Sequence, residues 1–479
     1  MTDTPESPVR TAPLPGTAVG DVAPFGPRLR WHLVQLMTLA WPVMLSRAGI
    51  LMLAFADIAM LGRHGPGAVG EATLGLAIFV PALVLAIGLV SGSVPVIARA
   101  EGAGNRRETG HAWRRAMAWG IAVSAVGALA TWHGDTWLAL AGIEADEAEA
   151  GGAVARMLAP GLIAQVLFAV CAFYLEATGR PLPALAVMAG ANIANLGLNW
   201  LMIGGNLGLP GMGAEGAALA TTIVRWGAVA AMVAIILTRS GAREAGVFDA
   251  RAPGEHRASP WGPGGWRAGA MMRRLGLSAG LSNGFETIGF AVISLFAGQL
   301  GRLSLDAYAI SHNLVTTIFM VGLGLAVATG VRVGHETGRG RPGEAAFAGW
   351  CGMGAAAAVM GVLTLAVLLF RPAIAAVYTN DTVLAGEVVA LLAFSALIFA
   401  PDSLQVVAGQ AIRALGDAWV AIGIYVIAFV VLMIPAGWWL AMHTPLGVLG
   451  LPLAITACCL VAFVLLAWRF RVLTLRIAP

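Results

Sequence analysis

Three acidic residues, Asp57, Glu286 and Asp402, lie inside long apolar stretches of the sequence. An ionisable side chain at the centre of a membrane-spanning helix costs at least about 2.5–3.5 kcal/mol, so it usually faces an interior cavity and binds something. Glu286 lies near the middle of the stretch 275–299, and Asp402 follows Pro401 in a later stretch. We therefore expect Glu286 and Asp402 to bind the coupling cation of a transporter, with Asp57 as a rival site.

The residue types around Asp402 indicate which cation could bind. Sodium prefers several hard oxygen ligands, which two carboxylates and the amide of Gln405, three residues after Asp402, would supply. A proton needs only one carboxylate. Two acids in one half of the chain favour sodium, although a proton stays open. No other metal and no cofactor is expected.

Three amides form a stripe in the stretch 184–204. Asn192, Asn195 and Asn199 are spaced by three, four and seven residues, which places them on one face of a helix. Amides on such a face can hydrogen-bond between membrane helices and hold them together. They can equally offer neutral oxygens to a cation or hold a proton on Asp57, and the sequence leaves both interpretations open.

Two further residues stand out in the first apolar stretch. Pro42 removes a backbone hydrogen bond and tends to kink a helix, which a membrane protein tolerates where neighbouring groups compensate. Arg47 lies ten residues before Asp57, and we expect it to pair with an acid elsewhere in the helix bundle. Together with Gln405 and Arg225, these residues are candidates for lining the cavity or its gate.

Composition identifies the elements that must position these residues. The chain has 479 residues, of which 58% are hydrophobic and 11% charged, against roughly 25% charged residues in soluble domains. This composition indicates an all-α polytopic membrane protein. A spanning helix needs about 20 mostly apolar residues. That criterion predicts twelve spans, near 34–61, 73–97, 116–133, 154–177, 184–204, 212–237, 275–299, 307–331, 348–370, 384–408, 418–440 and 446–468.

The distribution of arginine predicts the orientation. All 29 basic residues are arginine, and short loops rich in basic residues stay in the cytoplasm. With a cytoplasmic N-terminus, 23 arginines fall on the cytoplasmic side and only four outside. Both termini are therefore predicted to be cytoplasmic. The net charge of +4 serves this orientation, so a nucleic-acid partner is not expected.

The ends and the middle of the chain differ from the spans. Residues 1–33 are rich in proline and lack a secretory signal, so we expect a disordered cytoplasmic tail. Residues 238–274 are polar and rich in proline and glycine, and they predict a cytoplasmic linker between two six-helix lobes at 34–237 and 275–470. Residues 471–479 are expected to form a short cytoplasmic tail.

Short internal repeats support two related lobes. EGAGNRRE at 101–108 resembles TGRGRPGE at 337–344, displaced by 236 residues. ATGR at 177–180 resembles ALGD at 414–417, displaced by 237 residues. Because each lobe holds an even number of spans, the repeats are parallel and should be related by an axis along the membrane normal. The predicted fold is thus two pseudo-symmetric six-helix bundles.

Enzymatic and metal-site motifs are missing from the sequence. The four cysteines lie in apolar stretches with no CxxC pair, which argues against a disulfide or zinc site. The glycine-rich runs lack the strand and lysine of a phosphate-binding loop. The arginine-rich cytoplasmic loops contain no DDxxD, so a membrane-embedded transferase is not expected.

Several motifs in this order resemble the multidrug and toxic compound extrusion (MATE) family, closest to its bacterial NorM-like branch. They include ADIAMLGR around Asp57, NLGLNW in the amide stripe, SNGFETIGFAV around Glu286 and VRVGHETG at 331–338. The pattern D-x-x-Q-x-x-x-G-x-x-x-R-x-x-G-D from Asp402 continues the series, and the resemblance covers about residues 34–470.

The resemblance implies a fold, an activity and site residues. It implies two six-helix lobes in a V shape around a central cavity. By position, Glu286 and Asp402 match the acids of the C-lobe cation site, while Asp57, Asn195 and Asn199 match the polar network of the N-lobe. Arg47 and Arg225 depart from the family pattern, which usually has a neutral residue and an aromatic residue at these positions. Two added positive charges in the helix bundle argue against the usual preference for cationic substrates.

The sequence therefore predicts a secondary multidrug antiporter in the bacterial inner membrane. It would export amphipathic organic compounds, mostly cations, in exchange for Na⁺ or H⁺ by alternating access, and would act as a monomer in the lipid bilayer. The alternative is a flippase for lipid-linked saccharides of the same superfamily, for which a basic cavity is expected and to which Arg47 and Arg225 would contribute.

Overall fold

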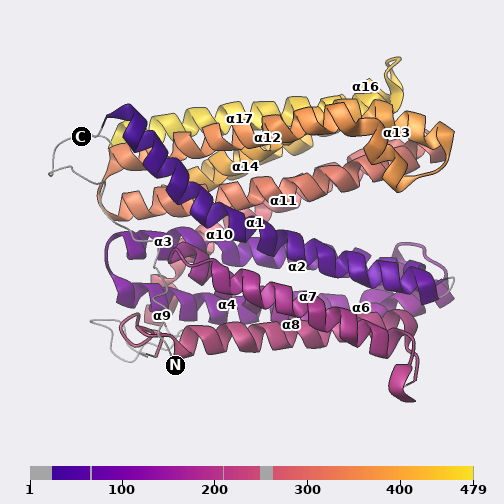
Figure 1. The fold of residues 1–479 in the computed structure, drawn as a ribbon, viewed down its shortest axis with the longest axis horizontal. Helices are drawn as coiled ribbons and strands as arrows, with labels where there is room; N and C mark the ends of the chain where they lie inside the picture. The colour runs from indigo at the N-terminus through magenta and orange to yellow at the C-terminus, as the bar shows by residue number, and fades with distance from the viewer. Residues whose placement is uncertain (1–23, 65–66, 209, 249–262, 478–479) are drawn as a thin grey trace. The chain divides into compact units, whose positions relative to one another are not determined.

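Long apolar helices make up most of the described chain (Figure 1). The computed structural model describes residues 24–64, 67–208, 210–248 and 263–477, and all regular secondary structure in these ranges is helical. Eleven helices or continuous helix runs there are long and apolar enough to span a membrane. A bent pair, α4 (Arg106–Trp132) and α5 (Gly134–Leu140), meets at 58° and makes a twelfth if the pair is one span. The prediction of an all-α polytopic membrane protein with twelve spans is confirmed.

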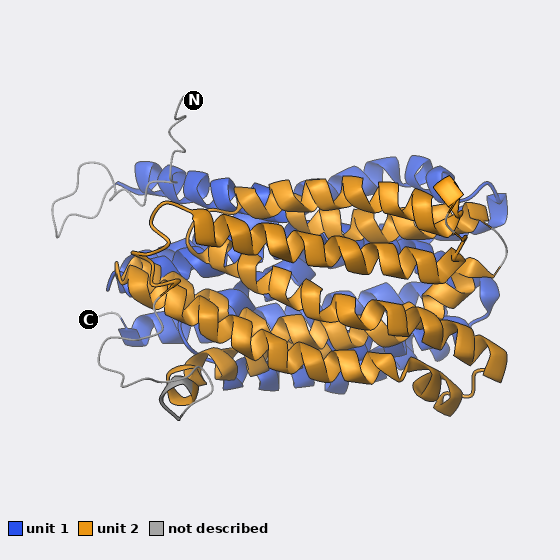
Figure 2. Cartoon of the chain, turned by 90° about the horizontal axis from the view of Figure 1, so that it is seen from below, with its two compact units in different colours: residues 1–44, 285–479 blue, residues 45–284 orange. Residues whose placement is uncertain are grey.

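The internal contacts divide the chain into two units, coloured separately in Figure 2. Unit 1 comprises residues 1–44 and 285–479, and unit 2 comprises residues 45–284. Both boundaries fall inside a helix, because α1 (Phe25–His64) and α10 (Ala270–Gln299) each contribute to both units. The lobes predicted from composition, in contrast, have their boundaries in loops.

Unit 2 is built around α6, which is apolar on all sides and buried along most of its length. Helices α2, α4, α5 and α8 pack against it, as expected for a helix without a polar face. The complete helices of unit 2 are α2 (Ala68–Ser91), α3 (Ser93–Gly102), α4 (Arg106–Trp132), α5 (Gly134–Leu140), α6 (Ala145–Ala177), α7 (Leu182–Ile203), η1 (Asn206–Gly208), α8 (Gly213–Thr238) and α9 (Pro263–Ala268).

Unit 1 has its core where α11 packs against α14, and α14 in turn packs against α17. Two of its spans contain a segment that is not α-helical, the 3₁₀ turn η2 and the π-helix η3. Its complete helices are α11 (Arg302–Gly338), α12 (Pro342–Tyr378), α13 (Thr382–Ser395), η2 (Ala396–Ile398), α14 (Phe399–Ala414), α15 (Trp419–Tyr425), η3 (Val426–Met433), α16 (Ile434–Met442), η4 (Gly447–Leu449) and α17 (Gly450–Ile477).

The structure supports the internal repeat through its turns. Gly104 and Gly340 both have a positive φ, 72° and 69°, and each follows a helix that ends in the same pattern of backbone hydrogen bonds. Gly179 and Gly416 form a second pair, with φ of 76° and 89°. Glycine adopts this left-handed conformation without the steric cost that a side chain adds. The short sequence matches therefore mark the same turn in each half.

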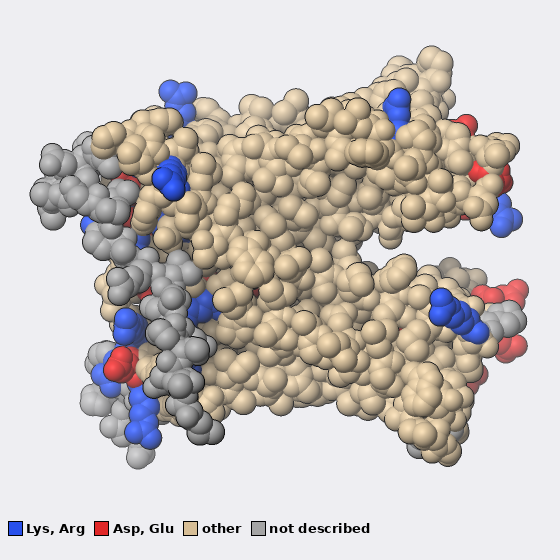
Figure 3. Space-filling model, viewed as in Figure 1, with Lys and Arg blue, Asp and Glu red and all other residues tan. Residues whose placement is uncertain are grey.

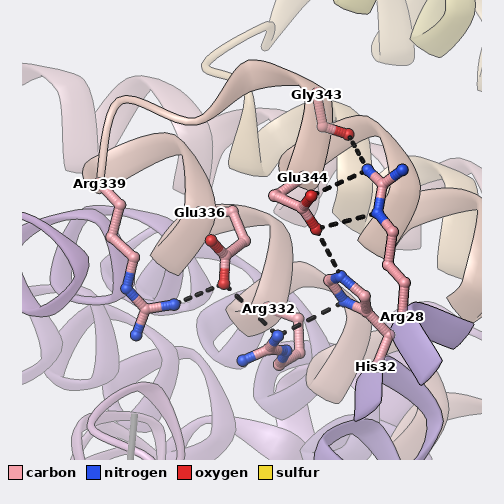
Figure 4. Close-up of polar contacts among 7 residues, drawn as sticks. All are labelled: Arg28, His32, Arg332, Glu336, Arg339, Gly343 and Glu344. Atoms are coloured by element: carbon pink, nitrogen blue, oxygen red, sulfur yellow. Dashed lines mark hydrogen bonds and ion pairs between the residues drawn. The ribbon is translucent and has the colours of Figure 1, made fainter. Parts of the chain in front are cut away.

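The start of α1 corrects one prediction. Residues 25–33 were expected in a disordered tail, but the helix begins at Phe25. Proline at 27 is tolerated in the first helical turn, and the polar side chains that lowered the hydropathy are held by partners. In unit 1, Arg28 and His32 contact Glu344 at the start of α12 (Figure 4). The rest of the predicted tail, residues 1–23, lies outside the described residues.

Two other predicted loops are shorter than expected. Helix α10 begins at Ala270, so the last residues of the predicted linker are helical, and α17 continues through Ile477. Residues 249–262 of the linker lie outside the described residues. The first part of α10 packs closely on α2, since a Cβ at Gly280 or Gly276 would lie 3.2 Å from the Leu89 side chain or 2.0 Å from its carbonyl oxygen. Small residues permit such close helix packing.

Charged side chains gather towards the ends of the helices, and the face shown in Figure 3 has a broad uncharged band between them. Such a band suits the hydrocarbon layer of a bilayer, in which exposed charges are costly. The acids and arginines that lie within the spans are instead turned towards other helices, where they form the sites described next.

Candidate functional site

Glu286 and Asp402 meet in unit 1, where the amide of Gln405 bridges them. The Gln405 Nε2 donates to Glu286 Oε1 at 3.1 Å and to Asp402 Oδ1 at 3.3 Å. The Gln405 Oε1 is buried and has no hydrogen-bond partner among the described residues. Buried polar atoms are normally satisfied, so an unpartnered oxygen beside two carboxylates is a ready cation ligand. The expected convergence of the two acids is therefore found.

The helices explain how these side chains are brought together. Asp402 lies in the first turn of α14, directly after the 3₁₀ turn η2 that interrupts this span. Glu286 lies on α10, and Gly289 lies one turn further on, directly against η3. A Cβ at Gly289 would lie 2.3 Å from Met433 Cε and 3.1 Å from the Phe429 carbonyl oxygen. Glycine at this position thus allows α10 to approach the π-helix and hold Glu286 near α14.

Two other groups act on the acids of unit 1. The Cys459 thiol donates to Asp402 Oδ1 at 3.8 Å. The guanidinium of Arg413 is buried, and its charge interacts with that of Glu286. Its Nε and Nη2 have no hydrogen-bond partner in the described part of the chain. The two carboxylates share one neutral amide and form no ion pair with Arg413, so a single Na⁺ or H⁺ can be held between two acids.

Asp57 lies in unit 2 within a network of neutral donors. The Asn199 Nδ2 donates to Asp57 Oδ1 at 2.6 Å, and the Thr221 hydroxyl donates to Asp57 Oδ2 at 2.7 Å. Asn195 Nδ2 donates to the Thr221 hydroxyl at 3.0 Å. Both carboxylate oxygens of Asp57 are therefore already hydrogen-bonded by uncharged groups from α7 and α8.

Asn192 does not join this network. Its Nδ2 donates to the Gly49 carbonyl oxygen of α1 at 3.0 Å and to Met188 of its own helix at 2.9 Å. This amide holds α7 against α1, as the helix-packing interpretation of the stripe predicts. The predicted stripe therefore divides, with two amides at Asp57 and one between helix backbones.

Arg47 and Arg225 lie in different surroundings. Arg47 forms the expected ion pair, since its Nη2 lies 3.0 Å from Glu176 Oε1 and both side chains are buried. Arg225 lies on α8, one turn after Thr221, with its Cζ 4.7 Å from the centre of the Phe79 ring. Its Nη1 is buried without a hydrogen-bond partner among the described residues. Pro42 is buried in α1, two residues before the boundary between the units.

Replacing Thr221 with Val should test the Asp57 network. The substitution removes the donor to Asp57 Oδ2 and the acceptor for Asn195, and we expect it to lower the free energy of unfolding by about 1–3 kcal/mol. Thr238→Val is the matched control on the same helix, because that hydroxyl is exposed and bonds only to the Ala234 carbonyl oxygen. Thermal melting of both purified variants measures the difference, and equal melting temperatures would contradict the assignment.

Unit 1 contains a further polar cluster that was not predicted from the sequence (Figure 4). This α1 ionic cluster consists of Arg28, His32, Arg332, Glu336 and Glu344. Arg28 Nη2 lies 3.0 Å from Glu344 Oε1, and His32 Nε2 lies 2.8 Å from Glu344 Oε2. The other ring nitrogen, Nδ1, faces Arg332 Nη2 at 3.4 Å. His32 therefore donates through Nε2 and accepts through Nδ1, which assigns the neutral tautomer.

Other residues of these polar contacts were also missed. Thr221 and Glu176 contact predicted residues, yet neither was singled out from the sequence. The spacing of Thr221 and Arg225, four residues apart on one helix face, was the available signal for Thr221. Glu176 ends an apolar stretch and directly precedes the repeated ATGR turn, where an acid could have been taken for a solvated helix end.

Comparison with known proteins identifies a family model and close relatives that match most of the chain. The MatE family model matches residues 42–201 and again residues 279–439. The “Probable multidrug resistance protein NorM” of Caulobacter vibrioides is 36% identical over 470 residues, covering 96% of each chain. The “Multidrug resistance protein PmpM” of Pseudomonas aeruginosa is 30% identical and covers 89% of this chain and 88% of that protein.

A solved structure supplies the fold. The crystal structure of the eukaryotic MATE transporter AtDTX14 superimposes with a TM-score of 0.82 at 19% sequence identity, covering 94% of this chain and 100% of that one. The two matched segments of the family model also lie in the two repeated halves of the sequence. The family model, the relatives along nearly the whole chain and the shared fold show that the chain belongs to the MatE family of transporters.

Proposed function

We propose that this transporter is a secondary active antiporter that exports amphipathic organic compounds, mostly cations, in exchange for an inflowing cation. The observation that supports this proposal is the site of Glu286, Asp402 and Gln405. It has two carboxylates joined by one amide, whose oxygen has no hydrogen-bond partner among the described residues. A buried negative charge in a membrane protein is costly, so binding of a cation stabilises the site.

The site favours sodium as the coupling cation. Glu286, Asp402 and the Gln405 Oε1 offer hard oxygens, the ligand type that sodium prefers. In the ion-free arrangement the Gln405 Nε2 lies between the carboxylates and donates to both of them. Rotation of this amide would place its oxygen towards a bound ion, so Gln405 acts as the group that alternates between the empty and the filled site.

Competition couples the two transported species. An organic cation and the coupling cation would both be attracted to the same carboxylates, so each would weaken the binding of the other by the same factor. Entry of the coupling cation would then release the exported compound, as the site is exposed in turn to either side of the membrane. The names of the bacterial relatives, multidrug resistance proteins, support a broad range of substrates.

The proposal includes a location and an assembly state. The transporter would lie in a bacterial inner membrane as a monomer, with both termini in the cytoplasm. The excess of arginine in the predicted cytoplasmic loops supports this orientation.

The alternative of a lipid-linked saccharide flippase has less support. It was kept because Arg47 and Arg225 would make a cavity basic. The charge of Arg47, however, is neutralised by Glu176 at 3.0 Å. Only Arg225 remains, which is insufficient for a basic cavity and leaves the antiporter as the better proposal.

Transport by purified protein in liposomes tests the proposal. A fluorescent organic cation such as ethidium is loaded, and a sodium gradient or a proton gradient is imposed separately. We expect the sodium gradient to drive ethidium movement in exchange for sodium. Movement with the proton gradient alone would identify H⁺ as the coupling cation, and movement with neither gradient would contradict antiport.

A further inference from the structure

Arg225 and Asp57 are two charged groups within the spanning part of unit 2 that form no ion pair with each other. Both oxygens of Asp57 are hydrogen-bonded by neutral groups, Asn199 and Thr221. Arg225 lies on α8 one turn beyond Thr221, whose hydroxyl donates to Asp57 Oδ2. The guanidinium therefore shares a helix with a partner of the carboxylate, and it forms no ion pair with Asp57.

The side chains around Arg225 stabilise its positive charge without neutralising it. The Phe79 ring lies 4.7 Å from the guanidinium Cζ and is itself almost fully buried, and the face of an aromatic ring attracts a positive charge. Gly161 lies beside the group, since a Cβ there would be in van der Waals contact with Arg225 Nη1 at 3.4 Å. No acid within 4.0 Å of Arg225 occurs in the described ranges, so its charge stays available to Asp57.

The buried Arg47 of unit 2 cannot perform this role. Arg47 is bound to Glu176 at 3.0 Å, and that pair is neutral by itself. Arg47 and Glu176 therefore form one balanced couple in the spans of unit 2, while Arg225 and Asp57 are an arginine and an acid of equal and opposite charge that form no ion pair. The site of unit 1, in contrast, has two acids joined by the neutral amide of Gln405.

We propose that the fixed positive charge of Arg225 compensates the negative charge of Asp57, in place of a transported cation. Asp57 then binds neither Na⁺ nor H⁺ during transport, although it is a carboxylate like the two acids in the site of unit 1. Arg225 thereby sets the number of coupling cations at one per chain. This inference rests on the proposed cation coupling, but it concerns a different residue pair in the other unit.

The inference predicts that removing the charge of Arg225 creates a cation site. In Arg225→Gln the carboxylate of Asp57 loses its counter-charge, while Asn199, Asn195 and Thr221 still hold it in place. We expect this variant to bind one more cation per chain than the wild type. Arg225→Lys keeps the charge and is the matched control, for which no additional cation is expected.

Binding of radioactive sodium by equilibrium dialysis, with proton uptake followed in weakly buffered solution, measures the stoichiometry on purified protein. The double variant Glu286→Gln/Asp402→Asn provides a background in which the site of unit 1 is lost. In that background, Arg225→Gln should restore binding of one cation per chain, and adding Asp57→Asn should abolish it again. Size-exclusion chromatography confirms that each variant is folded.

The outcomes separate this inference from the proposed function. A folded Arg225→Gln variant that binds no additional Na⁺ or H⁺ would overturn the inference. Asp57→Asn in the wild-type background gives an independent test that leaves Arg225 intact, because a reduction in bound cation would also overturn it. If the wild type itself binds no cation at Glu286 and Asp402, the proposed coupling is wrong, while the gain that depends on Asp57 still decides the role of Arg225.

Discussion

Glu286→Gln is expected to abolish gradient-driven efflux, a loss of roughly 100-fold, which corresponds to the upper range of coupling between two sites. The substitution removes one of the two negative charges that attract the coupling cation. The new amide can still accept the hydrogen bond that Gln405 Nε2 now donates to Glu286 Oε1. The fold should therefore be retained while the cation no longer displaces the substrate. Efflux of ethidium from everted vesicles measures the effect.

A matched control for this variant is Asp306→Asn. Asp306 lies on α11 in the same unit, but it is exposed and lies 4.0 Å from the exposed Arg302. Asp306→Asn removes one negative charge, as Glu286→Gln does, but it leaves the site unchanged. Efflux should therefore stay at the wild-type rate. Normal efflux by Glu286→Gln, or equal losses in both variants, would exclude Glu286 as a coupling residue.

Glu336→Leu is expected to destabilise unit 1 strongly. Glu336 is 1% exposed and accepts from Arg332 Nη2 at 3.4 Å and from Arg339 (Figure 4). Arg332 is 3% exposed and also stacks on Trp31, with its Cζ 4.5 Å from the ring centre. Removing the acid leaves a buried arginine without its counter-charge, which costs about 3–5 kcal/mol. A lower melting temperature of the purified protein in detergent measures this loss.

A paired substitution distinguishes lost charge pairing from poor packing. In Arg332→Met/Glu336→Leu both buried charges are removed together, and replacing a buried ion pair with apolar side chains is often neutral or stabilising. The double variant should regain most of the lost melting temperature. Asp306→Asn again serves as the exposed control, because surface ion pairs contribute little. If the double variant melts as low as the single one, packing and not charge explains the effect.

Hydropathy and repeated turns predicted the fold well, for a physical reason. A spanning helix satisfies its backbone hydrogen bonds internally, so its existence depends on local composition. The turns at Gly104 and Gly340 require a left-handed residue, which leaves a mark in the sequence. The acids Glu286 and Asp402 could also be identified in advance, because an isolated charge in an apolar stretch is costly wherever it lies.

Partners distant in the sequence could not be predicted in the same way. Arg28 and His32 lower the hydropathy of the first stretch, so its helix was expected to begin nine residues late. Their partner, Glu344, lies more than 300 residues further along the chain, and local composition contains no information about it. The pairing of Arg47 with an acid was expected, but the identity of Glu176 depends on how α1 packs against α6.

The sharing of α1 between the two units has a consequence for synthesis. Arg28 and Glu344 are separated by 316 residues, so translation at about 5–20 residues per second makes the acid roughly 15–60 s after the arginine. The helices of unit 2, between residues 45 and 284, are completed within that interval. Helix α1 is therefore made before the complete helices of unit 2, yet its N-terminal end can be fully packed only after they are made.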